Sequence, residues 1–220
     1  MKVGIIAPIK MLRNYCTTSV QYYLPGLLEN EEYREFYSTL PKGTTKIMDC
    51  RKPIWRGKPE DLETCKLGCD LQPNYIILPS WMFNPEETVK VGRKYASKLN
   101  CLNSKLIACL EGTTKKEVLD CAKSLGGFSG YAIPSHLYSI CKKIPRSKLT
   151  IYIENYSKYN ELEGLNGILV TSLPVRLGLQ GRLLSDYLPS PSSLTFYERE
   201  DKYPLVVEKN IKEDINFYGE

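Results

Sequence analysis

The sequence predicts an α/β protein, a single (β/α)8 TIM-like barrel that is compact or partly abbreviated. Eight short runs rich in β-branched and other apolar residues recur along the chain, and each ends in a polar or breaker residue. Most of these runs precede a stretch with helical periodicity. Eight strands joined mostly by helices are typical of a closed parallel barrel. The chain has 220 residues, which is short for a fold that typically takes roughly 250, so some connections must be brief.

The eight expected strands are spread over most of the chain. They cover residues 3–7, 20–24, 45–49, 75–78, 105–109, 130–133, 149–153 and 167–170. Beyond residue 186 the pattern changes to a loop, one short strand at 194–197 and a polar tail. We therefore expect a barrel over residues 1–188 and a C-terminal extension over residues 189–220 that packs on it.

Several of the intervening helices carry clear start signals. Asn84 precedes Pro85 and two acids, which is the pattern of an N-cap followed by proline in the first turn. Thr114, with Glu117 three residues later, is typical of a capping box. Among the expected helices are those over residues 59–68, 84–99, 113–125 and 175–184.

Composition and motifs exclude several classes of protein. The formal net charge of +5 is mild, so it permits a polyanionic partner without requiring one. Neither of the common glycine-rich phosphate loops is present, nor is a Gly-x-Ser-x-Gly elbow. No apolar stretch is long enough to span a membrane. The single histidine, His136, follows an expected strand, where it either takes part in catalysis or caps and packs a helix.

The eight cysteines are expected to be reduced thiols in a cytoplasmic protein, because no secretory signal precedes the first strand. A disulfide-using hyperthermophilic cytosol is the alternative. Cys50, Cys65 and Cys69 have no fourth ligand at zinc-finger spacing. We therefore expect no metal and no cofactor.

A barrel of this kind places its site at the carboxyl ends of the strands. Three carboxylates follow expected strands there: Asp49, Glu111 and Glu154. Carboxylates crowded in a partly dry site repel one another, so the pKa of one rises while another stays ionised. Such a pair suits glycosidic bond cleavage, with Asp49 and Glu154 as the catalytic groups. The alternative is that each is a solvated acid or pairs with an arginine.

Other residues at the strand ends are candidates for binding. Trp81 offers a face on which a base can stack, or it packs a lid. Arg176 follows the last strand, in the sector of the barrel where phosphate commonly binds, although a surface role fits equally. The other expected substrate-binding residues are Ser80, Glu111, Gly112, Pro134 and Thr171.

Five short segments resemble the tRNA-guanine transglycosylase superfamily. They are residues 46–50, 76–88, 107–112, 130–134 and 167–176. The similarity is strongest to compact phage and archaeal relatives that act in 7-deazaguanine modification of DNA. It implies that Asp49 acts on the exchanged base and that Glu111 and Gly112 occupy the place of a base-reading Gln-Gly. The resemblance supports the same barrel fold.

Two positions depart from the pattern of that family. Ser80 stands where the family has a base-recognising Asp, and Val170 stands where it has the Asp nucleophile. Base exchange needs a carboxylate that attacks the sugar carbon as the base leaves, and valine cannot do this. The cysteine-rich zinc site of the tRNA enzymes is also missing. The resemblance therefore supports the fold better than the reaction.

Three hypotheses of function follow. The first is a pentosyltransferase or N-glycosidic enzyme that exchanges or cleaves a guanine or 7-deazaguanine in DNA or tRNA. The second is a non-catalytic barrel that binds nucleic acid or serves an active paralogue as a partner subunit. The third is a small-molecule lyase or hydrolase that uses the same carboxylates. The expected partners are nucleic acid, a purine-like base, and a second copy or a paralogue, without a membrane.

Overall fold

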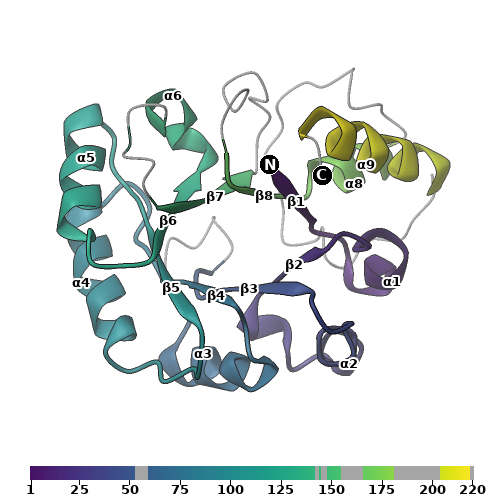
Figure 1. Ribbon diagram of the computed structural model, residues 1–220, viewed down its shortest axis with the longest axis horizontal. Coiled ribbons are helices and arrows are strands. Elements are labelled where there is room, and N and C mark those ends of the chain that lie inside the picture. The colour runs from purple at the N-terminus through teal and green to yellow at the C-terminus, as the bar shows by residue number, and fades with distance from the viewer. Residues whose placement is uncertain (53–58, 142–143, 145–147, 155–165, 181–203, 219–220) are drawn as a thin grey trace.

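The computed structural model has a closed barrel of eight parallel strands in sequence order, so the predicted (β/α)8 fold is confirmed (Figure 1). The structure describes residues 1–52, 59–141, 144, 148–154, 166–180 and 204–218. The strands are β1 (Lys2–Ile5), β2 (Val20–Tyr23), β3 (Thr45–Asp49), β4 (Tyr75–Ile77), β5 (Lys105–Cys109), β6 (Gly130–Pro134), β7 (Leu149–Glu154) and β8 (Ile168–Thr171). All eight expected strands are present, and their ends differ from the prediction by at most two residues.

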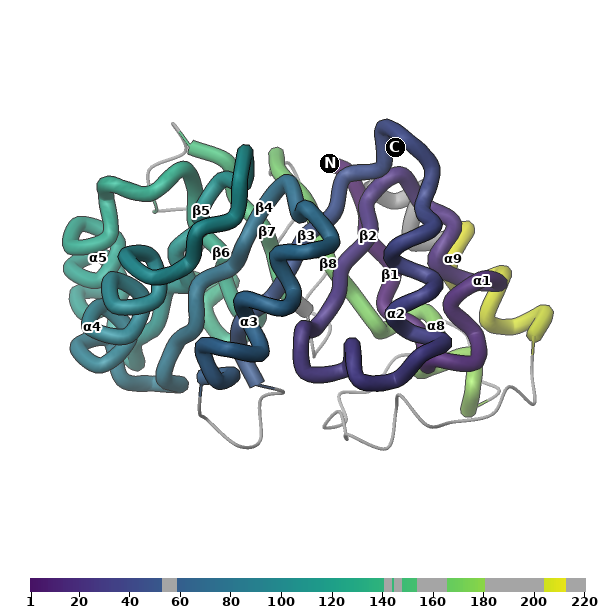
Figure 2. Tube along the Cα trace, turned by 90° about the horizontal axis from the view of Figure 1, so that it is seen from below, coloured from purple at the N-terminus to yellow at the C-terminus, as the bar shows by residue number. Residues whose placement is uncertain are grey.

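Helices surround the strands on the outside of the barrel (Figure 2). They are α1 (Leu12–Tyr15), α2 (Glu31–Ser38), α3 (Leu62–Gly68), α4 (Pro85–Ala96), α5 (Lys115–Ser124), α6 (Tyr138–Cys141), α8 (Leu173–Gly178) and α9 (Pro204–Tyr218). The helix expected after residue 153 and the strand expected at 194–197 lie outside the described residues. Helix α8 begins at Leu173, two residues before the predicted start at 175, and its predicted end at 184 also lies outside them.

The start signals explain where the helices begin. The Asn84 side chain accepts a hydrogen bond from the backbone N–H of Glu87, and Thr114 with Glu117 forms the predicted capping box. The predicted start of α3 at residue 59 is wrong by three residues. Asp61 is the N-cap there, since its side chain accepts from the backbone N–H of Thr64, while Pro59 instead forms an isolated bridge with Arg51.

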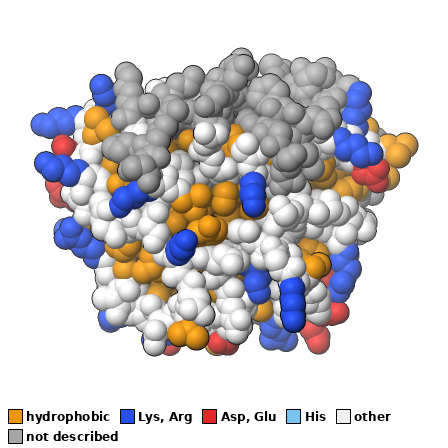
Figure 3. Space-filling view, in the orientation of Figure 1, with side chains coloured by type: hydrophobic (Ala, Val, Ile, Leu, Met, Phe, Trp, Pro, Cys, Tyr) orange, Lys and Arg blue, Asp and Glu red, His pale blue; other side chains and the backbone are white. Residues whose placement is uncertain are grey.

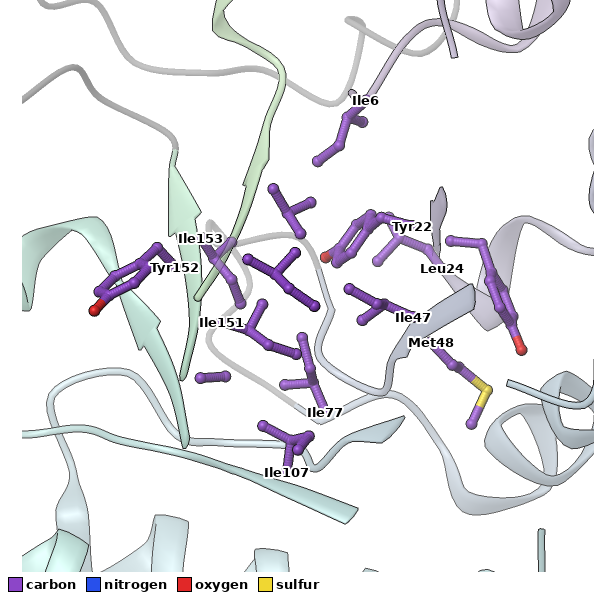
Figure 4. Packing of buried hydrophobic residues seen from close by; sticks show 14 of the residues in the cluster. Ile6, Tyr22, Leu24, Ile47, Met48, Ile77, Ile107, Ile151, Tyr152 and Ile153 are labelled. Atoms are coloured by element: carbon purple, nitrogen blue, oxygen red, sulfur yellow. The ribbon is translucent and has the colours of Figure 1, made fainter. Parts of the chain in front are cut away.

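The barrel interior is filled with branched aliphatic side chains. Ile47, Ile77, Ile107 and Ile151, from four different strands, are fully buried and point toward one another inside the barrel (Figure 4). Their neighbours in sequence, such as Met48, point outward to the helices, as the alternation of a strand requires. The centre is therefore a packed core, and chemistry is confined to the ends of the strands.

The C-terminal helix α9 packs against α8 and also contacts β1 (Figure 1). Gly178 of α8 lies so close to Val207 that an added Cβ would sit 2.4 Å from the Val207 Cγ2 atom. The amide of the fully buried Asn210 donates to the carbonyl of Pro174 across 3.1 Å. The sequence predicts an extension over residues 189–220 that packs on the barrel, but it does not predict the helix α9. The division of the chain at residue 188 stays a prediction.

Cys69 and Cys101 form a disulfide, with their Cα atoms 5.3 Å apart. The expectation that all thiols are reduced is therefore wrong for this pair, whose 32-residue separation hid their proximity. Cys16, Cys50, Cys65, Cys109 and Cys121 are free and buried. None of the described helices is both long enough and apolar enough to cross a membrane.

Candidate functional site at the strand ends

Asp49 ends β3 and is the more tightly held of two buried carboxylates at the mouth of the barrel. It lies two residues after the inward-pointing Ile47 and is only 1% exposed. The Arg51 Nε donates to both of its oxygens at 2.9 and 3.0 Å, and Nη2 donates to Oδ2 at 2.5 Å. The backbone N–H of Arg51 and the hydroxyl of Tyr22 also donate to it. The Asp49 carboxylate therefore faces a fork-shaped cation.

The Arg51 guanidinium is the main positive charge of this part of the site. Burial alone would lower its pKa, but the charge of Asp49, assisted by Cys109 and a hydrogen bond to Asp49, raises that pKa well above its usual range. The guanidinium therefore stays charged. Its Nη1 atom also contacts the Cys109 sulfur at 3.5 Å, so the cation extends from β3 to the end of β5.

Glu111 follows β5 by two residues and is the second buried carboxylate, at 2% exposure. Its partners carry no fixed positive charge. The Ser80 hydroxyl donates to Oε1 at 3.1 Å, and the backbone N–H of Phe83 donates to Oε2 at 3.2 Å. His136 Nε2 lies 3.1 Å from Oε2. Glu111 thus gathers groups from the ends of β4 and β6.

The His136 ring lies between Glu111 and Phe83. Its side chain remains 24% exposed, and its ring centroid is 4.9 Å from that of Phe83, edge to face. When Nε2 donates to the Glu111 carboxylate, Nδ1 is the ring nitrogen that remains to accept a proton. Phe83 adopts a left-handed backbone conformation with φ of 61°. This conformation is unfavourable for a bulky residue, and the tight turn imposes it here.

Cys109 separates the two carboxylate clusters. Burial raises the pKa of its thiol to about 12, with Arg51 partly opposing this and Glu111 adding to it. The group is therefore a neutral thiol at physiological pH and not a thiolate nucleophile. It fills the space between the Arg51 cation and the Glu111 carboxylate.

The structure brings some of the predicted site residues together. Asp49, Ser80 and Glu111 belong to the two clusters just described. Gly112 directly follows Glu111 with φ of 150°, and a side chain there would crowd Glu117 and Val118, so its role is to turn the chain. The roles of Asp49, Ser80 and Glu111 stay predictions.

Other predicted residues are placed differently. Pro134 ends β6 just before the His136 turn. Thr171 is fully buried, and its hydroxyl oxygen accepts from the backbone N–H of Leu173. Arg176 lies buried in α8 at 4% exposure, and the expected surface alternative is wrong. Glu154 ends β7, paired with Thr171, and its side chain lies outside the described part of the structure.

Tyr22 and Cys109 are absent from the site residues that the sequence predicts. His136 enters there only as an alternative, and Arg51 and Phe83 only as residues near the strand ends. Arg51 and His136 had usable signals, since Arg51 is two residues from Asp49 and His136 is the only histidine and follows a strand. Tyr22 and Cys109 gave none, because they are inward-facing residues within strands. Among the described residues, no group of three or more His, Cys, Asp and Glu side chains is arranged to hold a metal ion.

Comparison with known proteins gives the fold and no family. No family model matches the chain, and no curated protein matches its sequence. The chain is similar to the solved structure of the YdjI aldolase from Escherichia coli K12, with a TM-score of 0.59, 12% identity, and coverage of 99% of this chain and 90% of that one. A second similar structure is the N-acetylneuraminate lyase from Mycoplasma synoviae, with a TM-score of 0.53, 12% identity, and coverage of 100% and 97%. A third is the phosphoenolpyruvate phosphomutase from Streptomyces platensis subsp. rosaceus. Its TM-score is 0.51 at 10% identity, and the match covers 81% of this chain and 78% of that one.

The resemblance to tRNA-guanine transglycosylases is wrong. The solved structures similar to this chain include aldolases, a lyase and a phosphomutase. The predictions of base exchange or glycosidic cleavage in nucleic acid and of 7-deazaguanine modification are therefore wrong. The alternative prediction of a non-catalytic partner subunit is not supported either. The physical reason is that the matched segments are strand ends, which every parallel barrel shares. The side chains around them differ: Val170 is fully buried and apolar, and Glu111 binds His136.

Proposed function

We propose that the chain is a lyase of the aldolase type, which breaks or forms a carbon–carbon bond next to a carbonyl group. The observation that carries this is the Glu111–His136 pair at the carboxyl ends of β5 and β6, with Nε2 held at 3.1 Å and the ring partly exposed. A histidine that a buried carboxylate orients can act as a general base toward the protons of a bound ligand. The aldolases and the lyase among the similar structures favour this class, although at 10 to 12% identity the likeness itself concerns the fold.

The cleavage step needs one base and one site for negative charge. In the proposed step, His136 Nδ1 takes the proton of the hydroxyl β to the substrate carbonyl. The bond between the α and β carbons then breaks, the hydroxyl-bearing fragment leaves as an aldehyde or ketone, and the electron pair forms an enolate. The protonated His136 then returns the proton to the enolate α carbon, which restores the neutral imidazole.

Arg51 is the group that stabilises the enolate oxygen in this proposal. Its charge is permanent because of Asp49, and a preorganised cation in a poorly hydrated site stabilises developing negative charge strongly. Asp49 binds the guanidinium and the Tyr22 hydroxyl donates to Asp49, so both act as positioning residues. Glu111 does not contact the reacting atoms either, and it positions His136 and balances the charge that His136 gains.

Isotope exchange tests this function without knowledge of the aldehyde partner. The protein is incubated in D₂O with pyruvate, dihydroxyacetone phosphate or acetone, and deuterium at the α carbon is followed by NMR. Enolate formation predicts exchange with at least one of these compounds. Replacement of His136 by Gln should slow it by roughly 10²-fold or more, while the exposed Glu86→Gln control should leave it unchanged.

Two results would overturn the proposal. One is an exchange rate in His136→Gln equal to that of the wild type, because the base would then lie elsewhere. The other is no exchange with any of the three carbonyl compounds while the protein is folded by circular dichroism.

The cellular location and the partners that the sequence predicts stay proposals. The cytoplasmic location is one of them, and the reduced Cys16, Cys50, Cys65, Cys109 and Cys121 are compatible with it. The expected partners, nucleic acid or a second chain, are untested. On the face in Figure 3, lysine and arginine side chains are spread out and do not gather in one patch.

A further inference from the structure

A pocket of about 300 Å³ lies beside the barrel mouth, between the segment that precedes α3 and the helix α4. Pro59 and Trp81 form two of its walls, and Val91 and Tyr95 add apolar surface from α4. The Tyr95 hydroxyl donates to the carbonyl of Glu60 at 2.6 Å, which fixes the chain that carries Pro59 against the helix. The pocket is therefore lined largely by apolar surface, and the Tyr95–Glu60 hydrogen bond fixes two of its sides relative to each other.

The rim of this pocket is basic. Lys90 and Lys94 are one helical turn apart on α4 and both line it. Lys90 pairs with Glu87, which also lines the pocket, at 2.6 Å. Lys94 makes no ion pair within the described part of the chain. The charge of Lys94 is therefore not neutralised by an ion pair at the rim of the pocket that Trp81 also lines.

Both walls of the pocket connect to the candidate site by short backbone paths. Pro59 forms a bridge with Arg51, the residue that holds Asp49. Trp81 begins the turn, closed by a hydrogen bond from Asn84 N–H to the Trp81 carbonyl, that carries Phe83. The Phe83 N–H binds Glu111, and its ring packs on His136. A ligand between Pro59 and Trp81 would therefore fix both clusters.

We propose that this pocket binds a small organic anion with a planar apolar body, such as an aromatic phosphate, and that its occupancy stabilises the Trp81–Asn84 turn. The ring lies against Trp81 and Pro59, and the anionic group meets Lys94 at the rim. Binding stabilises the turn and thereby the Phe83–Glu111 hydrogen bond. The pocket is a regulatory site separate from the strand-end residues, and it is tested without substrate, so its result is independent of the lyase proposal.

Phenyl phosphate is the probe, and Trp81 is the reporter. The chain has two tryptophans, so the Trp55→Phe variant leaves Trp81 as the only indole. Phenyl phosphate should change its emission saturably, while phenol and inorganic phosphate should each bind at least about tenfold more weakly, because each lacks one half of the contacts. Lys94→Gln should weaken the binding of phenyl phosphate by about tenfold, because one charge-assisted contact is lost. Lys98→Gln, exposed just beyond the same helix, is the matched control and should bind as the parent does.

Hydrogen exchange at the Phe83 amide tests the connection to the site. If the turn can open only after the ligand leaves, a ligand concentration about ten times Kd should slow hydrogen exchange at the Phe83 amide about tenfold. Equal binding of phenol, or equal binding by Lys94→Gln, would overturn the anion site, as would the absence of saturable change in Trp81 emission. Saturable binding with an unchanged Phe83 exchange rate would overturn the coupling.

Discussion

The two carboxylates at the mouth of the barrel are equally buried but differ in what neutralises them. Asp49 faces Arg51, a cation that cannot lose its proton, in a forked pair reinforced by Tyr22. Glu111 faces a hydroxyl, a backbone N–H and His136, whose charge depends on its own proton. The first arrangement is permanent, whereas the second changes when His136 gains or loses a proton.

This difference separates a cluster whose charge is fixed from one whose charge can change. A buried ion pair resists rearrangement because breaking it leaves an uncompensated charge. A carboxylate–histidine pair accepts a proton at the far ring nitrogen with little cost, since the carboxylate is already in place to stabilise the imidazolium. We therefore expect substitutions at Asp49 to lower stability and also to disturb Arg51, whereas substitutions at Glu111 should act mainly on turnover.

The largest effect is expected for Glu111→Gln. The amide keeps hydrogen bonds to Ser80 and Phe83 but cannot orient and stabilise protonated His136, so the rate of α-proton exchange should fall by roughly 10² to 10⁴-fold. The melting temperature should change by only a few degrees. The measurement is NMR-detected exchange beside thermal unfolding, and a large loss of stability with retained exchange would reverse the roles of the two clusters.

Asp49→Asn should be the most destabilising single change at the mouth. It leaves the Arg51 guanidinium, whose side chain is 11% exposed, without its counter-charge, and breaking such a pair typically costs about 3 to 5 kcal/mol. Urea unfolding measures this difference. The combined Asp49→Asn/Arg51→Met variant should recover part of the loss, because no unpaired charge remains.

The control for Asp49 is the exposed Glu63–Lys66 pair on α3, where both side chains face solvent. Glu63→Gln should cost no more than about 0.5 kcal/mol. Equal effects for Asp49→Asn and Glu63→Gln would mean that Arg51 is well hydrated without its partner.

The Cys109 thiol between the clusters should make stability fall in alkaline solution. Its folded-state pKa is raised to about 12 from an ordinary 9.0, so between these values the folded chain binds more protons than the unfolded chain. The contribution is complete below pH 9 and is lost as pH rises toward 12, at up to about 1.4 kcal/mol per pH unit. Cys109→Ala should flatten the slope by that amount between pH 9 and 10.5. An unchanged slope would show that the thiol ionises normally.

Ser80→Ala should give the smallest effect. It removes one neutral donor to Glu111, a 3.1 Å hydrogen bond, and should cost about 1 kcal/mol of stability. Exchange activity should fall only a few-fold, because Phe83 and His136 still hold the carboxylate. A loss as large as that of Glu111→Gln would mean that Ser80 itself contacts the substrate.

Local patterns in the sequence were sufficient for the architecture. The apolar runs gave every strand, and the capping residues Asn84 and Thr114 gave the starts of α4 and α5. The start of α3 was misplaced because Pro59 takes part in a bridge to Arg51, a contact that no local pattern contains. The helix α9 was missed because its polar sequence becomes buried only by packing on α8.

The sequence by itself determined the barrel and the carboxylates at its strand ends, since strand periodicity and residue type are local properties. Only the tertiary structure decided which partner each carboxylate has. Arg51 and Asp49 are near neighbours in sequence, but Glu111 and His136 are separated by 25 residues, and Cys69 and Cys101 by 32. Such pairs form where the ends of neighbouring strands meet around a closed barrel. For the same reason, short segments that resembled another family matched its strand ends without sharing its site.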